Sequence, residues 1–422
     1  MTTPARLSEL ATADDYDPDS MPVERARAHI RAFLTPVTTL ERVHVRHAPG
    51  RVLGEDLVSP IHVPGHDNSA MDGWAVRHAD LQPDADVTLQ VAGTSFAGRP
   101  FEGSVAPGQA VRIFTGAVMP PGCDTVIMQE RARAADGRVT LGGGAKPGQN
   151  RRRAGEDIRA GSTVLSGGQR LRAADAGLIA SLGIGEITVF RRLRVAFFST
   201  GDELVQIGTT PGRGQIYDSN RYTLHAMLTG LGCEVLDMGV IRDDPAAVEL
   251  AFAQAAAAAD VVLTSGGASV GDADYVKQIL DRLGEVLFWK IAMKPGRPLA
   301  FGRIGNTHLF GLPGNPVAVM VTFYQFVREA LLVLMGQSQV PPCPTFKATL
   351  ASPLKKAPGR VEFQRGILAP AEGGWSVALT GEQGSNILSS MSRANCFVVL
   401  PTECGNLAPG ALVDVQPFEG IL

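Results

Sequence analysis

Between residues 193 and 337, short apolar runs alternate with stretches of helical periodicity, and this alternation is the strongest constraint on the fold. The apolar runs that read as strands are 193–204, 233–241, 260–267, 285–293 and 298–304. The helical patterns are 217–232, 245–258, 272–284 and 316–336. Strands that alternate with helices predict a doubly wound, mostly parallel sheet covered by helices on both faces.

Local signals mark where these helices begin and end. In the first, we expect Ser219 or Asn220 to be the N-cap and the glycine at its end to stop the helix. The second starts with Pro245 near its first position, where proline is favoured.

Conspicuous polar loops follow the predicted strands. They are STGDEL at 199–204, RDDP at 242–245, SGGASVGDAD at 265–274 and KPGRP at 294–298. Because ligands of doubly wound sheets bind beyond the carboxyl ends of the strands, we expect these loops to form one site. Glu203 is a candidate residue of this site, although a solvated loop charge explains it equally well.

The stretch 260–298 carries the centre of this predicted site. Its glycine loop leaves a strand and enters a helix, which exposes backbone N–H groups to an anion. The loop residues that we expect at the anion are Ser265, Gly266, Gly267 and Ser269. Two carboxylates could hold a divalent cation, and two lysines supply positive charge; these residues are Asp272, Asp274, Lys290 and Lys294. Together they predict a site for a phosphorylated substrate.

These features also have structural explanations. The glycine loop lacks both the GK[ST] of a Walker loop and the GxGxxG dinucleotide fingerprint, and a tight strand-to-helix turn needs glycine too. Aspartate is favoured at helix N-termini whatever the function, which applies to Asp272, Asp274, Asp243 and Asp244. The two lysines favour the functional interpretation, because a strand end facing the loop has little structural need for them.

Two proline-stiffened loops, KPGRP and GLPGNP, preset backbone geometry and reduce the entropy lost on binding. Their candidate binding residues are Pro295, Pro313, Gly314 and Asn315. The pair Asn315 and Pro316 is also the pattern of an N-cap followed by a proline in the first helical turn.

The remaining segments predict four further regions. Residues 1–20 are expected to be a disordered leader, residues 63–157 a small β domain, and residues 338–422 a barrel-like C-terminal β domain. Residues 21–62 and 158–192 would form an extended linking and dimerisation domain. Near the end of the small β domain, Arg151 and Arg152 are expected to be a solvated face.

Composition excludes several classes of protein. The formal net charge of −3 provides no basic field for nucleic acid. The five cysteines are scattered without a CxxC pair, which indicates reduced thiols in a cytoplasmic protein. We find no signal peptide and no uncharged apolar window of about 18 residues, so no membrane span is expected. His62, His66 and Asp67 fit no standard zinc spacing, and Cys123 has no nearby histidine to activate it.

A set of linked motifs resembles one known family. The motifs are DNSAMDGWA, RIFTGAVMPPGCDTVIMQE, RAGED, STGDEL, GQIYDSN, SGGASVGDADY, FWKIAMKPGRP, GLPGNPV, RVEFQRG and GSNILSS. Their order and spacing resemble the MoeA-type molybdopterin molybdenumtransferases, a family that includes the E-domain of gephyrin. The resemblance runs from about residue 21 to the C-terminus.

The resemblance implies an activity and an assembly. Such proteins insert molybdenum from molybdate into adenylylated molybdopterin with Mg²⁺, and release AMP and molybdenum cofactor. The family works as a homodimer, its sheet domain resembles the partner adenylyltransferase (MogA-like), and acceptor molybdoenzymes or chaperones receive the product. The implied site lies between the sheet domain and the C-terminal β domain, with a contribution from the partner subunit.

Site residues are also implied, position by position. They are Asp72, Thr115, Asp157, Glu203, Asp243, Asp274, Lys290, Lys294, Arg365 and Ser385. Lys290, Lys294 and Arg365 would neutralise the molybdate dianion, and Ser385 would donate a hydrogen bond. Asp274, with Asp243 or Asp272, would hold Mg²⁺, and Glu203 or Asp243 would manage protons.

Two alternatives remain open. The adenylylating enzyme shares the sheet domain, although the additional β domains and the KPGRP and GLPGNP loops argue against it. A non-catalytic, gephyrin-like docking scaffold is the other, and the retained lysines and aspartates disfavour it.

Overall fold

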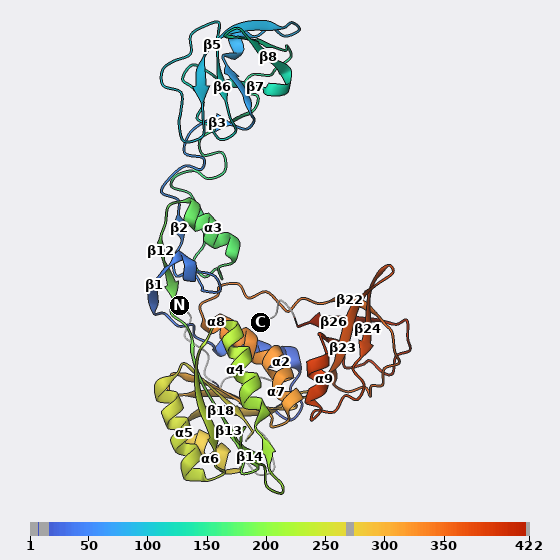
Figure 1. The fold of residues 1–422 in the computed structure, drawn as a ribbon. Helices are drawn as coiled ribbons and strands as arrows, with labels where there is room; N and C mark the ends of the chain where they lie inside the picture. Colours follow the sequence, from blue (N-terminus) through green and yellow to red (C-terminus); the bar gives the residue numbers. More distant parts are fainter. Residues whose placement is uncertain (1–6, 8–16, 267–273, 419–422) are drawn as a thin grey trace. The chain divides into compact units, whose positions relative to one another are not determined.

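The computed structural model describes residues 7, 17–266 and 274–418. The chain divides into two compact units (Figure 1), each of which is described by itself. Unit 1 comprises residues 1–54, 168–172 and 187–422, and unit 2 comprises residues 55–167 and 173–186.

The centre of unit 1 is a six-stranded sheet. Its order is β16 (Glu234–Ile241), β13 (Arg194–Thr200), β17 (Val261–Ser265), β21 (Thr307–Leu312), β20 (Pro298–Ile304) and β18 (Gly284–Lys290). The first four strands are parallel, whereas β20 is antiparallel to both of its neighbours. The predicted doubly wound, mostly parallel sheet is confirmed.

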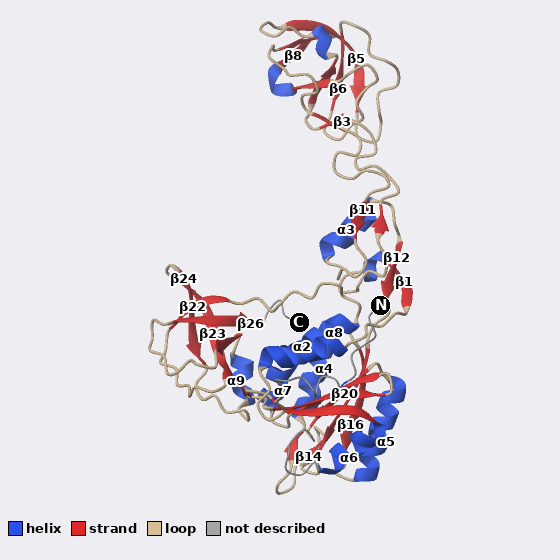
Figure 2. Cartoon of the chain, turned by 180° about the vertical axis from the view of Figure 1, so that it is seen from behind, coloured by secondary structure: helices blue, strands red, loops and turns tan. Residues whose placement is uncertain are grey.

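Helices cover both faces of this sheet (Figures 1 and 2). Since successive residues of a strand point to opposite sides, each strand contributes side chains to two cores. Val195 and Phe197 belong to a core with α2 (Val23–Phe33) and α4 (Ser219–Leu231). Ala196 and Phe198 belong to a second core with α5 (Pro245–Ala258) and α6 (Asp274–Leu283). The strands are therefore apolar on both sides.

The caps of these helices correct one expectation. The side chain of Asp218, rather than Ser219 or Asn220, accepts a hydrogen bond from Arg221 N and caps α4. The side chain of Asn220 instead donates hydrogen bonds to Ser265 Oγ and to the carbonyl oxygen of Gly314. Gly232 ends the helix in the left-handed region, and Pro245 occupies the first turn of α5, as the sequence predicts.

The last helix of the domain changes its winding in the middle. It begins as α7 (Pro316–Thr322), passes through a π-helical turn η4 (Phe323–Val327) and ends as α8 (Arg328–Leu334). By length and composition, residues 316–334 would be able to cross a membrane, contrary to the expectation that no segment would, but 83% of the tested window is buried in the protein. It packs into the core that contains α2 and α4.

The C-terminal part of unit 1 is a ring of strands. It consists of β23 (Val361–Ala371), β24 (Gly374–Leu379), β22 (Phe346–Leu350), β26 (Leu412–Pro417) and β25 (Cys396–Leu400), and β25 pairs back to β23. A closed ring has no free edge, which is the predicted barrel-like form. Helix α9 (Leu388–Arg393) lies beside it, and β19 (Met293–Lys294) from the KPGRP loop pairs with β23.

The start of the described chain also belongs to unit 1. Residues 17–20, expected to be part of a disordered leader, are placed against the end of β18, where Lys290 N donates to Pro18 O over 2.7 Å. The remaining short elements are β1 (Leu40–His44), η1 (Val45–His47), β12 (Glu186–Phe190), β14 (Leu204–Val205) and β15 (Ile216–Tyr217). β1 pairs with β12, and β14 with β15.

Unit 2 contains the small β domain. Its sheet has the order β7 (Thr125–Met128), β4 (Gly73–Val76), β6 (Gln109–Ile113), β5 (Val87–Ser95), β9 (Arg138–Leu141) and β8 (Ala132–Ala135). The other elements of unit 2 are β2 (Leu57–Val58), β3 (Asn68–Ser69), η2 (His78–Asp80), η3 (Gln129–Arg131), β10 (Arg151–Arg152), β11 (Thr163–Leu165) and α3 (Ala173–Ser181). Arg151 is not a solvated charge as expected, because it pairs with Asp67.

Candidate functional site

The carboxyl ends of the central strands meet in register. Ser199 of β13 pairs with Ser265 of β17, which pairs in turn with Leu312 of β21. Gly266 follows with φ of +89°, and a Cβ atom there would lie 2.8 Å from the carbonyl oxygen of Thr200. The loop therefore requires glycine for both its backbone conformation and its close approach to β13.

Asn220 joins two of the predicted loops. Its side-chain Nδ2 donates to Ser265 Oγ over 2.8 Å and to the carbonyl oxygen of Gly314 over 2.7 Å. Asn220 is buried at the start of α4. The sequence marked it only as a possible cap within GQIYDSN, so its positioning role was missed.

A cavity of about 380 Å³ lies where three loops of unit 1 meet. Its lining comes from 294–298, 313–315 with Ala318, and 383–385. Of the predicted site residues it contains Lys294, Pro295, Pro313, Gly314, Asn315 and Ser385. Arg297 and Gln383 also line it, and the sequence reasoning did not select them as site residues.

Lys294 provides a cation at the rim of this cavity. Its side chain is 50% exposed, and its Nζ lies 3.4 Å from Glu362 Oε1, whose side chain is only 6% exposed. Glu362 also accepts a hydrogen bond from Gln364 Nε2. An ammonium has three donors, so the long contact to Glu362 leaves Lys294 able to bind an anion as well.

Arg365 is placed differently from the expectation that it neutralises the anion directly. It is 1% exposed, and its guanidinium donates to the carbonyl oxygens of Gln383 and Gly384 and to Ser390 Oγ. Burial lowers the pKa of Arg365 to about 10. Its role in this structure is to hold the loop that carries Ser385.

The same loop is tied to the long helix. The carbonyl oxygen of Ser385 accepts a hydrogen bond from Val317 N in the first turn of α7. Asn315 is the N-cap residue with Pro316 after it, but its side chain makes no capping hydrogen bond. Asn315 therefore keeps an amide beside the cavity.

Lys290 lies at the end of β18 and is paired. Its Nζ is 2.6 Å from Asp19 Oδ1, and Arg297 Nη2 is 3.4 Å from the carbonyl oxygen of Asp19. The hydrogen bond from Lys290 lowers the pKa of Asp19. Lys290 does not line the cavity that contains Lys294.

The acidic candidates of the sheet domain lie on exposed loops. Asp243 N donates to Asp202 Oδ1 over 3.3 Å, which brings the loops after β13 and β16 together. The carboxylate of Glu203 folds over Gly201, where a Cβ atom would meet it at 2.5 Å.

The metal site predicted from the sequence cannot be assembled from the described side chains. Gly267, Ser269 and Asp272 lie outside the described residues, and of Asp274 only the backbone is described. Within the described residues, no group of three or more His, Cys, Asp or Glu could hold a metal ion. The described carboxylates therefore form no cluster that could complete a Mg²⁺ site without phosphate or water ligands.

Unit 2 contains the remaining candidates. Asp72 Oδ1 accepts hydrogen bonds from both the backbone N–H and the hydroxyl of Thr115, each over 2.7 Å. These bonds, the backbone one first, lower the pKa of Asp72. Asp157 is exposed, and its backbone N–H donates to Val63 O. The described hydrogen bonds thus join Asp72 with Thr115, whereas that of Asp157 goes to Val63.

Three family descriptions match successive parts of the chain. The MoeA N-terminal region (domain I and II) matches residues 21–183, and a probable molybdopterin binding domain matches residues 196–332. The MoeA C-terminal region (domain IV) matches residues 347–418.

Whole-length relatives agree with these matches. A molybdopterin molybdenumtransferase of Haemophilus influenzae is 47% identical over 95% of this chain and 99% of its own length. Another, from a Nostoc strain, is 37% identical over 90% of each chain. A crystal structure of a molybdopterin biosynthesis MoeA protein from Pyrococcus horikoshii has a TM-score of 0.78 at 32% identity and covers 95% of this chain and 100% of its own.

Proposed function

Because this chain belongs to the MoeA family, we propose that it is a molybdopterin molybdenumtransferase of molybdenum cofactor biosynthesis. It transfers molybdenum from molybdate to adenylylated molybdopterin and releases AMP. The observation that carries this proposal is the cavity of unit 1, where the loops 294–298, 313–315 and 383–385 meet.

The cavity suits a tetrahedral dianion. Lys294 and Arg297 line it and provide positive charge, and Ser385 provides a hydroxyl. Charge-assisted hydrogen bonds to an anion are shorter and stronger than neutral ones. The proline residues fix the loops before the anion arrives, so less entropy is lost on binding. Molybdate is the anion that we propose for this place.

The glycine loop would receive the phosphates of the adenylylated substrate. Ser265 and Gly266 lie at the carboxyl ends of parallel strands, where doubly wound sheets bind ligands. Mg²⁺ belongs to the proposal as a companion of these phosphates, with Asp243, Asp272 and Asp274 as candidate ligands.

The assembly and the cellular context are proposed on the same basis. We propose a cytoplasmic homodimer that receives its substrate from an adenylyltransferase and passes the cofactor to acceptor molybdoenzymes or chaperones. The Asp72–Thr115 pair, the exposed carboxylate of Asp157 and the loop acids Glu203 and Asp243 would complete the catalytic set.

A single-turnover assay tests the activity. The purified protein is incubated with adenylylated molybdopterin, molybdate and Mg²⁺, and AMP release and pterin-bound molybdenum are measured. Both products are expected, and omission of molybdate should prevent formation of the molybdenum product. Substrate binding without any turnover would instead support the docking-scaffold alternative.

A further inference from the structure

Three buried polar atoms at the carboxyl edge of the central sheet have no hydrogen-bond partner. They are Ser199 Oγ, Asp218 Oδ2 and Asn220 Oδ1, in side chains of the described chain that are 0%, 3% and 9% exposed. An unpaired polar atom in the interior costs free energy, so each one in a folded protein requires an explanation. Because the three gather beside the glycine loop, we looked to a ligand of that loop for their partners.

The sheet and helix α4 bring these atoms to one place. Alternate residues of β13 face α4, and Ser199 is one of them. Ser199 pairs with Ser265 of β17, whose hydroxyl lies 2.8 Å from Asn220 Nδ2. Asp218 is the N-cap of the same helix. The unpaired atoms therefore lie around the start of α4, next to the glycine loop.

Two of the three atoms can only accept a hydrogen bond. Asn220 Nδ2 donates to the carbonyl oxygen of Gly314 over 2.7 Å, so the unpaired atom of this amide must be its oxygen. Asp218 uses Oδ1 to accept from Arg221 N over 3.1 Å, which leaves the second carboxylate oxygen unpaired. The hydroxyl of Ser199 can donate or accept. A ligand that satisfies this group must bring at least two donors.

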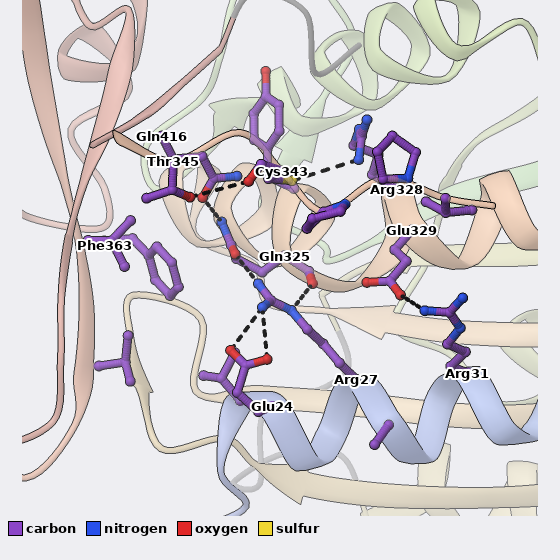
Figure 3. A pocket seen from close by; sticks show the side chains of 18 residues that line it. Glu24, Arg27, Arg31, Gln325, Arg328, Glu329, Cys343, Thr345, Phe363 and Gln416 are labelled. Atoms are coloured by element: carbon purple, nitrogen blue, oxygen red, sulfur yellow. Dashed lines mark hydrogen bonds and ion pairs between the residues drawn. The ribbon is translucent and has the colours of Figure 1, made fainter. Parts of the chain in front are cut away.

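A cavity of about 560 Å³ elsewhere in unit 1 gives no comparable indication of a ligand (Figure 3). It lies between α2, the linker 340–345 and strands β23, β25 and β26. Arg27 pairs with Glu24 there, and Arg31 pairs with Glu329. Because these charges are balanced within the protein, the cavity does not select a charged ligand.

A ribose provides two donors close to a phosphate. Its 2′- and 3′-hydroxyls are adjacent, and an acidic side chain that accepts from ribose hydroxyls is a recurrent feature of doubly wound nucleotide sites. In adenylylated molybdopterin the ribose follows the phosphates directly, whereas the ring that carries the dithiolene separates the pterin from them. Since Asn220 contacts Ser265 of the loop proposed for the phosphates, the ribose hydroxyls are better placed to reach it than the N–H groups of the pterin.

We propose that Asp218 and Asn220 are specificity-determining residues that bind the ribose of the adenylate. Asp218 Oδ2 accepts a hydrogen bond from one hydroxyl and Asn220 Oδ1 from the other. This inference rests on the proposed function, because AMP is the nucleotide that the transferase would release. It concerns binding alone, so it is measured with AMP and without turnover, while the single-turnover assay decides the activity separately.

Isothermal titration calorimetry of the full-length protein with AMP, in the presence of EDTA, tests the chemistry. Saturable binding of one equivalent per chain is expected. 2′,3′-Dideoxy-AMP should bind at least about tenfold more weakly, because a site built for hydroxyls leaves its buried acceptors unpaired without them.

Four results would overturn the proposal. Equal affinity for the two nucleotides would mean that water alone satisfies the acceptors, and the absence of saturable AMP binding would remove the ligand. Discrimination that appears only when Mg²⁺ is added would assign the acceptors to a metal ion. Displacement of AMP by free pterin would assign them to the pterin.

Asp218→Asn tests the place. Asparagine is as good an N-cap as aspartate, so its oxygen can keep Arg221 N while an amide nitrogen replaces the unpaired acceptor. We expect an unchanged unfolding midpoint and a preference for AMP over 2′,3′-dideoxy-AMP that is at least about threefold smaller than in wild type. The ratio is the proper readout, because loss of the Asp218 charge affects the phosphate of both nucleotides equally. Asp281→Asn, the same change on the exposed side of α6, should keep the full preference, and a full preference in folded Asp218→Asn would refute the assignment.

The two monodeoxy nucleotides test the second acceptor. 2′-Deoxy-AMP and 3′-deoxy-AMP should each bind to wild type at least about threefold more weakly than AMP. In Asp218→Asn, one of these two penalties should disappear and the other should remain, because Asn220 still accepts from its hydroxyl. Loss of both penalties would show that Asn220 does not bind the ribose. The wild-type comparisons decide the hydroxyl contacts even if Asp218→Asn does not fold.

Discussion

Lys290 Nζ lies 2.6 Å from Asp19 Oδ1, so one of the two lysines expected at the substrate is held by a carboxylate from residues just before α2. The side chain of Asp19 is 73% exposed and that of Lys290 35% exposed. Exposed ion pairs are weak, and a dianionic substrate can therefore displace Asp19. The proposed function therefore predicts that an anionic substrate displaces the Asp19 carboxylate from Lys290.

Replacement of this carboxylate should improve substrate binding. For Asp19→Asn we expect KM for the anionic substrate to fall roughly twofold to fivefold, the scale of one exposed charge interaction, with kcat unchanged. Initial rates of AMP release at low salt measure this, and the difference should shrink at high salt. Asp84→Asn, an exposed change in unit 2, is the control. An unchanged or raised KM in Asp19→Asn would contradict the displacement.

Lys294 should have separable roles in stability and in activity. Lys294→Ala leaves the buried carboxylate of Glu362 without its cation, and we expect a loss of about 1 kcal/mol in the free energy of unfolding, since half of Lys294 is exposed. We also expect at least about a tenfold loss in kcat/KM. Chemical denaturation and the AMP assay measure the two effects.

The double variant Lys294→Ala with Glu362→Gln separates these roles. Removal of the orphaned charge should restore most of the stability, because a neutral amide costs less to bury than an unpaired carboxylate. The activity should stay low. Recovery of activity together with stability would mean that Lys294 acts only through the fold.

The sequence predicted the sheet domain because the relevant signals are local. Alternation of apolar strands with helices, and polar loops at the strand ends, follow from neighbouring residues. The positions of Asn220 and Arg365 depend instead on contacts with residues far away in the chain, at Gly314 and Gly384. Residue type alone cannot distinguish an arginine that binds an anion from one that holds a loop.

The cap of α4 shows the same limit at short range. Asp218, Ser219 and Asn220 are all favourable N-caps, so the sequence leaves the choice open. The choice falls to Asp218 because Asn220 bonds to Ser265 and Gly314. A tertiary contact thus decides a local structure.

Two neighbouring glycines, Gly266 and Gly314, should respond differently to replacement by alanine. Gly266 has φ of +89°, and the Cβ that alanine would add there lies 2.8 Å from Thr200 O, whereas at Gly314 the nearest atom would be Gly266 Cα at 4.0 Å. We expect Gly266→Ala to lower the free energy of unfolding by about 1–3 kcal/mol. Gly314→Ala should leave it within about 0.5 kcal/mol of wild type. Equal loss in both variants, measured by denaturation, would contradict the geometry.

The Asp72–Thr115 contact predicts a measurable titration. The pKa of Asp72 should lie below its ordinary 3.8, because two donors of Thr115 stabilise the carboxylate. Thr115→Val removes the hydroxyl and keeps the backbone N–H, so the pKa should rise only part of the way back. NMR titration of the carboxyl carbon measures both values. A pKa in Thr115→Val that equals the wild-type value would show that the hydroxyl bond is absent in solution.

His308 should make unit 1 less stable in acid. The residue lies in β21 with its ring edge-to-face with Phe33, and burial lowers its pKa from 6.5 to about 4. Below pH 6.5 the unfolded chain binds a proton that the folded chain does not, so stability falls as the pH falls from 6.5 to about 4 and this contribution then levels off. This lowering of the pKa corresponds to a loss of about 3 kcal/mol in the free energy of unfolding at acid pH.

Denaturation of wild type and His308→Gln between pH 6.5 and about 4 should show a weaker dependence of stability on pH in the variant. The exposed His225→Gln should behave as wild type, and an equal pH dependence in all three proteins would refute the assignment to His308.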